Sequence, residues 1–212
     1  MKGLLMRDPK TYRNIVFDMG GILMDFDCDW VTEHFTDDPE IIRSIRNIFF
    51  YSSEWIRLDG GWISEETAYE LIRPRFSTEK EREIFDLVFE NWDKFNMHEK
   101  PGMKEVLELV HERGQHIYML SNANLRVVGM YQRVVPHPEY FEGVFISAEH
   151  QVIKPQIEIY QKFLREFGLN APDCLFIDDV LENVEGAKKA GIDAWQLTDG
   201  KAESIRAMLL GE

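Results

Sequence analysis

Short apolar runs that alternate with amphipathic stretches constrain the fold of this chain more than any other sequence feature. Five runs are typical of buried strands, at residues 14–18, 115–121, 143–147, 174–178 and 192–197. Helix-like segments lie among the later runs, at residues 103–113, 125–135, 156–167, 181–190 and 203–210. This alternation predicts an α/β fold, a doubly wound parallel sheet with helices on both faces.

The region between the first and second predicted strands breaks this pattern. Residues 39–51, 64–73 and 78–95 are typical of helices, with no buried-strand signal between them, and residues 96–102 look like a return hinge. We therefore predict an α/β core at residues 1–27 and 97–212 and an inserted helical unit at residues 28–96. An insert that leaves directly after the first strand would stand over the strand ends, where open α/β sheets bind ligands.

Charge and cysteine content exclude several classes of partner and compartment. The 212 residues carry 24 Lys and Arg against 38 Asp and Glu, a net charge of −14. This balance argues against nucleic acid or an anionic membrane, because both need clustered cations, but not against a small phosphorylated ligand. Cys28 and Cys174 form no CxxC motif, and the apolar stretch in MKGLLMRDPK is too short for a signal peptide. We expect a cytoplasmic protein that no membrane segment anchors.

Polar residues follow four of the predicted strands and would meet at one edge of the sheet. They are Asp18, Ser121, Asn122, Lys154, Asp178 and Asp179. The three carboxylates would repel one another unless a cation neutralises them, and an oxygen-only donor set favours Mg²⁺. The hydroxyl, amide and ammonium groups could then bind a phosphate, and one carboxylate could attack phosphorus.

These motifs together resemble the haloacid dehalogenase superfamily of phosphatases. The resemblance rests on FDMGG at residues 17–21, LSN at 120–122, Lys154-Pro155, and IDD at 177–179 followed by Asn183. The helical insert resembles the α-helical cap that follows the first motif in one subclass.

The resemblance implies a role for each of these residues. Asp18 would be the nucleophile and a Mg²⁺ ligand, and Ser121, Asn122 and Lys154 would hold the phosphoryl group. The metal site would be completed by the Gly20 carbonyl, Asp179 and Asp178, the last acting through water or by pairing with Lys154. The implied activity is Mg²⁺-dependent hydrolysis of a small phosphorylated metabolite.

The sequence departs from the family at Gly20, where most members carry a general acid and base aspartate. General acid catalysis contributes about 10²–10⁴-fold. Either the enzyme uses leaving groups that need little protonation, or the protein only binds phosphorylated ligands or a partner. The first reading fits sugar 1-phosphates or acyl phosphates, because FDMGG resembles a branch that includes glucose-1-phosphate phosphatases. Two roles are open for Asp25 and Asp27, which lie just past the first motif: they replace the aspartate missing at Gly20, or they serve a hinge or helix-capping role.

Two further features bear on the substrate. The paired acids Asp178 and Asp179 disfavour dehalogenation, because that reaction needs no metal. Several aromatic residues of the insert, with Arg57 and the Asp59-Gly60-Gly61 segment, form either the insert's core or its substrate-facing edge.

Overall fold

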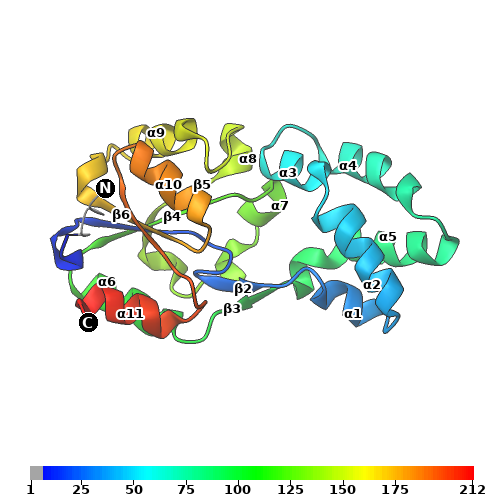
Figure 1. Ribbon diagram of the computed structural model, residues 1–212, viewed down its shortest axis with the longest axis horizontal. Helices are drawn as coiled ribbons and strands as arrows, with labels where there is room; N and C mark the ends of the chain where they lie inside the picture. Colours follow the sequence, from blue (N-terminus) through cyan, green and yellow to red (C-terminus); the bar gives the residue numbers. More distant parts are fainter. Residues whose placement is uncertain (1–6) are drawn as a thin grey trace.

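The computed structural model describes residues 7–212 and has a five-stranded, fully parallel sheet at its centre (Figure 1). The first six residues, which begin the MKGLLMRDPK segment, lie outside the described residues. The strand order is β5-β4-β1-β6-β7. The strands are β1 (Asn14–Phe17), β4 (His116–Ser121), β5 (Phe141–Ile146), β6 (Cys174–Asp178) and β7 (Asp193–Gln196). The predicted doubly wound parallel sheet is confirmed.

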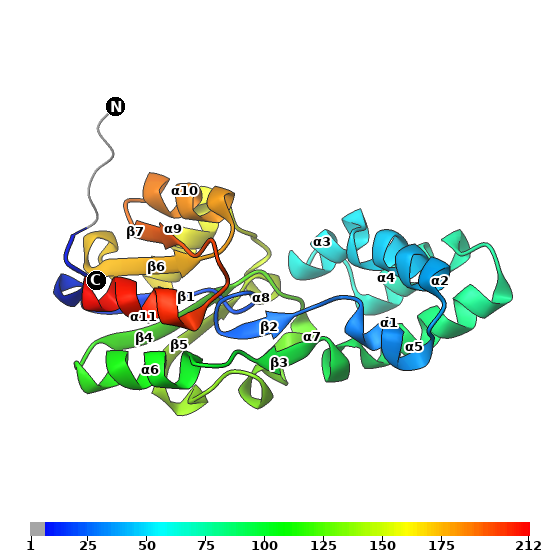
Figure 2. The same ribbon diagram turned by 60° about the horizontal axis from the view of Figure 1, so that its bottom comes forward.

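Helices cover both faces of the sheet, which explains why β1 and β6 are buried along their whole length. On one face, Ile15 and Phe17 of β1 pack with α6 (Met103–Glu112) and α11 (Ala202–Leu210). On the other, Val16 packs with α9 (Ile157–Glu166) and α10 (Leu181–Lys189). Figure 2 shows these two helix pairs on opposite sides of the sheet. The alternation of β1 side chains between two apolar layers fixes its register.

The inserted residues form a helical lobe beside the sheet (Figures 1 and 2). Its helices are α1 (Trp30–Phe35), α2 (Pro39–Ile45), α3 (Ser53–Asp59), α4 (Glu65–Ile72) and α5 (Glu79–Phe95), and a π-helical turn at Arg46–Phe50 continues α2. Phe49 and Phe85 are fully buried between these helices. Ser64 caps α4 and Thr78 caps α5 through their side chains.

A two-stranded antiparallel sheet, which the sequence pattern does not predict, connects the lobe to the core. It pairs β2 (Met24–Phe26) with β3 (Met97–Glu99), which lies where only a return hinge was expected. Strands of three residues are too short to show a period-two pattern. Helices α1 and α3 were also missed, because six or seven residues carry little helical periodicity.

The helix predicted at residues 125–135 is wrong in length. The structure has only α7 (Leu125–Val128), which ends at Gly129, and a 3₁₀ turn at Tyr131–Arg133. The remaining short elements are α8 (Ser147–His150) and 3₁₀ turns at Pro9–Thr11, Arg73–Arg75, Pro138–Tyr140 and Ala171–Asp173. Across residues 7–212, no helix has the length and apolar character to cross a membrane.

Candidate active site

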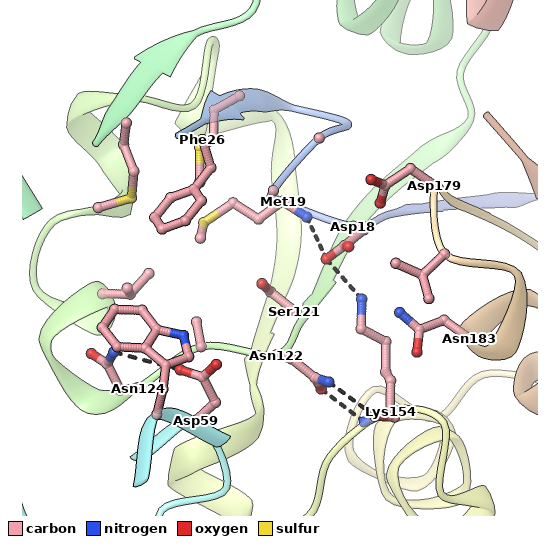
Figure 3. Close-up of a pocket in the computed structure, with 18 of the residues that line it drawn as sticks. Asp18, Met19, Phe26, Asp59, Ser121, Asn122, Asn124, Lys154, Asp179 and Asn183 are labelled. Carbon is pink, nitrogen blue, oxygen red and sulfur yellow. Dashed lines mark hydrogen bonds and ion pairs between the residues drawn. The ribbon is translucent and has the colours of Figure 1, made fainter. Parts of the chain in front are cut away.

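A cavity of about 390 Å³ lies where the ends of the parallel strands face the helical lobe (Figure 3). The core contributes six of the residues singled out in the sequence, Asp18, Gly20, Ser121, Asn122, Lys154 and Asp179, together with Asn183. The structure therefore brings all the predicted site residues together. Asp178 alone does not line the cavity, because it is fully buried behind Lys154.

Asp18 is held at the end of β1 by bonds from three directions. Its backbone N–H donates to the carbonyl of Ile177 at 2.9 Å, and its carboxylate accepts from the N–H of Met19 at 2.7 Å. The Nζ of Lys154 lies 2.7 Å from the same carboxylate oxygen. Burial raises the pKa of Asp18 to about 7; Lys154 opposes this shift and Asp178 adds to it. Added positive charge in the cavity would therefore favour the ionised, nucleophilic form.

Lys154 is the cation at the centre of the site and is only 3% exposed. Its Nζ lies 2.7 Å from both Asp18 and Asp178. Burial alone would lower the pKa of Lys154, but the two carboxylates raise it above its usual value, so the ammonium stays charged at neutral pH. The peptide bond from Lys154 to Pro155 is cis.

The Asn122 side chain holds Lys154 in place. Its carbonyl oxygen accepts from the backbone N–H of Lys154 at 2.7 Å, and its NH₂ group donates to the carbonyl of Lys154 at 3.0 Å. The sequence assigns this amide to the phosphoryl group, whereas in the structure both of its polar ends bond to the protein (Figure 3).

Asp178 is similarly engaged with protein donors. It accepts from the backbone N–H of Val180 at 2.8 Å, from the Asn183 amide at 3.1 Å and from Lys154. Of the two roles considered for Asp178, the structure therefore shows the pairing with Lys154.

The carboxylates form a group that fits a divalent cation. Asp18, Asp178 and Asp179 each place one oxygen within 4.8 Å of the others. Three carboxylates against the single ammonium of Lys154 leave an excess of two negative charges when all are ionised. Burial and the neighbouring Asp178 raise the pKa of Asp179, as expected for carboxylates that lack a counter-ion. Oxygen donors alone, with no sulfur or imidazole, fit Mg²⁺.

The loop after Asp18 passes very close to Asp179. Gly21 has φ +74°, and a Cβ there would lie 2.5 Å from an Asp179 carboxylate oxygen, so any larger residue would be strained and would displace that carboxylate. Within residues 7–212, no N–H or O–H donates to the Gly20 carbonyl, which leaves that oxygen available to a cation.

The Ser121 hydroxyl is a free hydrogen-bonding group in the cavity. Ser121 is 2% exposed, and its hydroxyl bonds to no other described residue. Figure 3 shows it between Asp18 and the lobe side of the cavity, where it could donate to an anion.

Asp25 and Asp27, which the sequence offered as replacements for the missing acid, lie away from the cavity. Asp25 is on β2 and pairs with Lys100, which also donates to the carbonyl of Gly200 at 3.0 Å. Asp27 accepts from the backbone N–H of Asp29 at 2.9 Å. Asp25 therefore ties β2 to the core, whereas Asp27 makes a local bond just before α1.

The lobe side of the cavity is mostly apolar. It is formed by Met24, Phe26, Trp55, Trp92, Met97 and Val127. Asp59 and Asn124 are the polar exceptions on this side, and Lys154 is the only cation among the described residues that line the cavity. Of the segment that the sequence offered as a substrate-facing edge, Asp59 faces the cavity and Arg57 does not.

This chain is similar in sequence to known phosphatases over most of its length. A sesquiterpene phosphatase of Aspergillus oryzae is 24% identical over 91% of this chain and 93% of its own length. A D-ribitol-5-phosphate phosphatase of Bacteroides thetaiotaomicron is 22% identical over 89% of this chain and 93% of its own.

Solved structures show the same fold. An enzyme of the haloacid dehalogenase family from Bacteroides thetaiotaomicron, solved with magnesium and inorganic phosphate, superposes with a TM-score of 0.70 at 22% identity, covering 90% of this chain and 96% of that one. The sequence profile of haloacid dehalogenase-like hydrolases matches residues 12–191, the greater part of the chain. The chain therefore belongs to the haloacid dehalogenase-like hydrolases.

Proposed function

We propose that this protein is a Mg²⁺-dependent phosphatase that hydrolyses a small phosphorylated metabolite through an aspartyl-phosphate on Asp18. The observation that carries the proposal is the buried Asp18 carboxylate, fixed 2.7 Å from the Lys154 ammonium inside a cluster of three carboxylates. The names of the two relatives, both phosphatases of phosphorylated small molecules, and the magnesium and phosphate in the similar solved structure support it.

The first step is transfer of the phosphoryl group to Asp18. An Asp18 carboxylate oxygen forms a bond to phosphorus, and the bond from phosphorus to the leaving oxygen breaks. Lys154 and the Ser121 hydroxyl hold the phosphoryl oxygens, and Asn122 contributes by fixing Lys154. In the second step a water oxygen bonds to phosphorus, the bond to Asp18 breaks, and inorganic phosphate is released.

Asp18, Asp179 and the Gly20 carbonyl would hold Mg²⁺, which would neutralise charge on the phosphoryl group. Asp178 would support the site from behind by orienting Lys154. The protein's own contribution is to keep Asp18 and Lys154 in contact and largely shielded from water before the substrate arrives.

The cavity favours a substrate whose organic part is uncharged. Its lobe side offers apolar side chains and no cation, so a second phosphate or a carboxylate would find no partner there. A phosphorylated alcohol, either a sugar 1-phosphate or a more apolar alkyl phosphate, fits this lining. Residues 28–96 would act as the cap that selects among them.

Arg126 of α7 joins this cap to the core. It donates to Glu65 of α4 at 2.8 Å and to Asp93 of α5 at 3.2 Å, and it also bonds to the carbonyl of Phe89. The cap and the core therefore share a charged contact beside the cavity.

Hydrolysis of p-nitrophenyl phosphate tests the proposed function. We expect phosphate release with Mg²⁺, its loss with EDTA, and its loss in Asp18→Asn. The matched control is Asp25→Asn, which changes an acid outside the cavity and should keep activity. Absence of activity on this substrate and on a panel of sugar 1-phosphates, acyl phosphates and alkyl phosphates would refute the proposed phosphatase activity and favour a phosphate-binding protein.

A further inference from the structure

Asp59 is a carboxyl group in the active-site cavity that the proposed chemistry does not use. Among the described residues, three carboxyl side chains line the cavity: Asp18, Asp59 and Asp179. The first is the proposed nucleophile and the third a proposed metal ligand. Asp59 comes from the lobe, at the last position of α3, and Figure 3 shows it across the cavity from Asp18, beyond Ser121.

The backbone around Asp59 is fixed to the core. Its carbonyl accepts from the Ser147 hydroxyl, and the Trp62 indole donates to the carbonyl of Gln151 at 3.1 Å. Gly61 has φ +65°, and a Cβ there would lie 2.1 Å from the carbonyl oxygen of Ala148, so the turn sits directly on the core. Asp59 is therefore positioned by the core as well as by the lobe.

The Asp59 carboxyl group has one polar neighbour, which leaves one of its oxygens free. The Asn124 amide donates to one carboxyl oxygen at 3.5 Å. The oxygen of that amide accepts from the backbone N–H of Arg126 at 3.2 Å, which orients the NH₂ group toward Asp59. Within residues 7–212, no Lys, Arg or His pairs with Asp59.

This environment favours a protonated carboxyl group. Burial raises the pKa of Asp59 well above its usual range, and the Asn124 hydrogen bond only partly opposes the shift. Its place at the C-terminal end of α3, where the helix dipole is negative, also disfavours a carboxylate. The cavity, which lacks an acid at Gly20, thus holds a carboxyl group whose surroundings favour its protonated form.

The direction of the reaction places the leaving group on the lobe side of the cavity, where Asp59 lies. In phosphoryl transfer the attacking and leaving oxygens lie roughly in line through phosphorus. With Asp18 attacking from the sheet, the leaving oxygen departs on the other side of phosphorus, toward the lobe that carries Asp59.

We infer that Asp59 is the proton donor to the leaving group, the role that Gly20 leaves unfilled; this inference rests on the proposed phosphatase function. As the bond between phosphorus and the leaving oxygen breaks, that oxygen takes the Asp59 proton and departs as a neutral alcohol. When water then attacks the phosphorylated Asp18, the Asp59 carboxylate takes a proton from the water, which restores the starting state. Asp59 is thus a catalytic residue supplied by the cap.

The test compares leaving groups of different basicity in wild type and Asp59→Asn. The measured quantity is kcat/KM, which covers the steps up to departure of the leaving group. A simple alkyl phosphate needs the proton, whereas p-nitrophenyl phosphate does not. We expect Asp59→Asn to lower kcat/KM for the alkyl phosphate by about 10²–10⁴-fold and for the aryl phosphate by less than about threefold. Asp25→Asn, the matched acid outside the cavity, should lower neither.

A rescue variant separates proton donation from a structural role. A Cβ at Gly20 would have Met24 Cε as its nearest contact, at 4.0 Å, so a side chain can start there without a clash. Adding Gly20→Asp to Asp59→Asn should restore at least about a tenth of the alkyl phosphatase activity, because it returns a donor to the site. A merely misfolded or undocked Asp59 variant would not be rescued.

Each outcome decides the assignment. A selective loss on the alkyl phosphate with rescue supports Asp59 as the donor. Equal losses on both substrates, no loss on either, or a selective loss without rescue overturn that role while leaving the phosphatase in place. Hydrolysis of neither substrate by the wild-type protein overturns the proposed function itself, and the assignment with it.

Discussion

Replacing Lys154 with methionine should destabilise the protein strongly, because it removes the one cation between two buried carboxylates. The Lys154 side chain is 1% exposed and its Nζ lies 2.7 Å from both Asp18 and Asp178. At an effective dielectric constant of about 20, each contact is worth about 6 kcal/mol of Coulomb energy before desolvation. Measured losses on breaking a buried pair are about 3–5 kcal/mol. We expect the free energy of unfolding of Lys154→Met to fall by that amount.

The assay is thermal and urea unfolding in metal-free buffer. For a chain of this size, 1 kcal/mol corresponds to about 2–4 °C in Tm, so the expected drop is about 6–20 °C. Because the pKa of Lys154 is raised in the folded state, its contribution is fully present at neutral pH and is lost only as the pH rises through that raised value. Mg²⁺ should recover part of the loss, since it would neutralise the same carboxylates.

A surface lysine provides the control for this prediction. Lys188 pairs with Glu185 at 3.1 Å, and both side chains are about half exposed, at 47% and 50%. Lys188→Met should change the free energy of unfolding by less than about 1 kcal/mol. A Lys154→Met protein within about 1 kcal/mol of wild type in metal-free buffer would refute the reasoning from the buried charge cluster.

Three further predictions follow from single contacts. Gly21→Ala should weaken Mg²⁺ binding, measured by calorimetry, because its Cβ would lie 2.5 Å from an Asp179 carboxylate oxygen. The control is Gly114→Ala, which has a similar φ of +68° but open space around its Cβ. It should lower the free energy of unfolding by only the backbone strain of about 1–2 kcal/mol and leave the Mg²⁺ affinity unchanged. Arg126→Met should speed hydrogen exchange in α4 and α5 more than in the sheet, because Arg126 bonds these two helices to the core. An equal change in exchange rate in the helices and in the sheet would contradict this role. Burial raises the pKa of Asp86, but the hydrogen bonds from Arg73 and Tyr69 outweigh this effect and leave the pKa below its usual value. Asp86→Asn should therefore reduce the free energy of unfolding by less than about 1 kcal/mol at neutral pH, and urea unfolding should show the difference vanish as the pH falls through that lowered pKa.

The sequence predicts the core well because its elements are long and wholly buried. The β6 strand is predicted with its observed bounds, Cys174–Asp178, since five consecutive buried positions produce a continuous apolar run. The carboxyl ends of parallel strands share one edge, which is why Asp18, Ser121 and Asp179 could be placed together before their distances were known. Short elements such as β2 and α1 leave no periodic signal and were missed.

Side-chain partners were harder to predict than positions. The Asn122 amide follows a strand as expected, but only the structure shows that it bonds to the Lys154 backbone. Asp59 belongs to a segment that the sequence identified only as core or edge. Its environment depends on Asn124 and Ser147, more than 60 positions away along the chain, so no local pattern could reveal it.

Trapping the phosphorylated enzyme tests the central claim most directly. Turnover of p-nitrophenyl phosphate with Mg²⁺ is quenched, the protein is reduced with borohydride, and the peptides are read by mass spectrometry. An aspartyl-phosphate is reduced to homoserine, and the account predicts this change at Asp18 in the wild-type protein and its absence without substrate. Modification at another residue, or phosphate release by Asp18→Asn at the wild-type rate, would contradict Asp18 as the nucleophile.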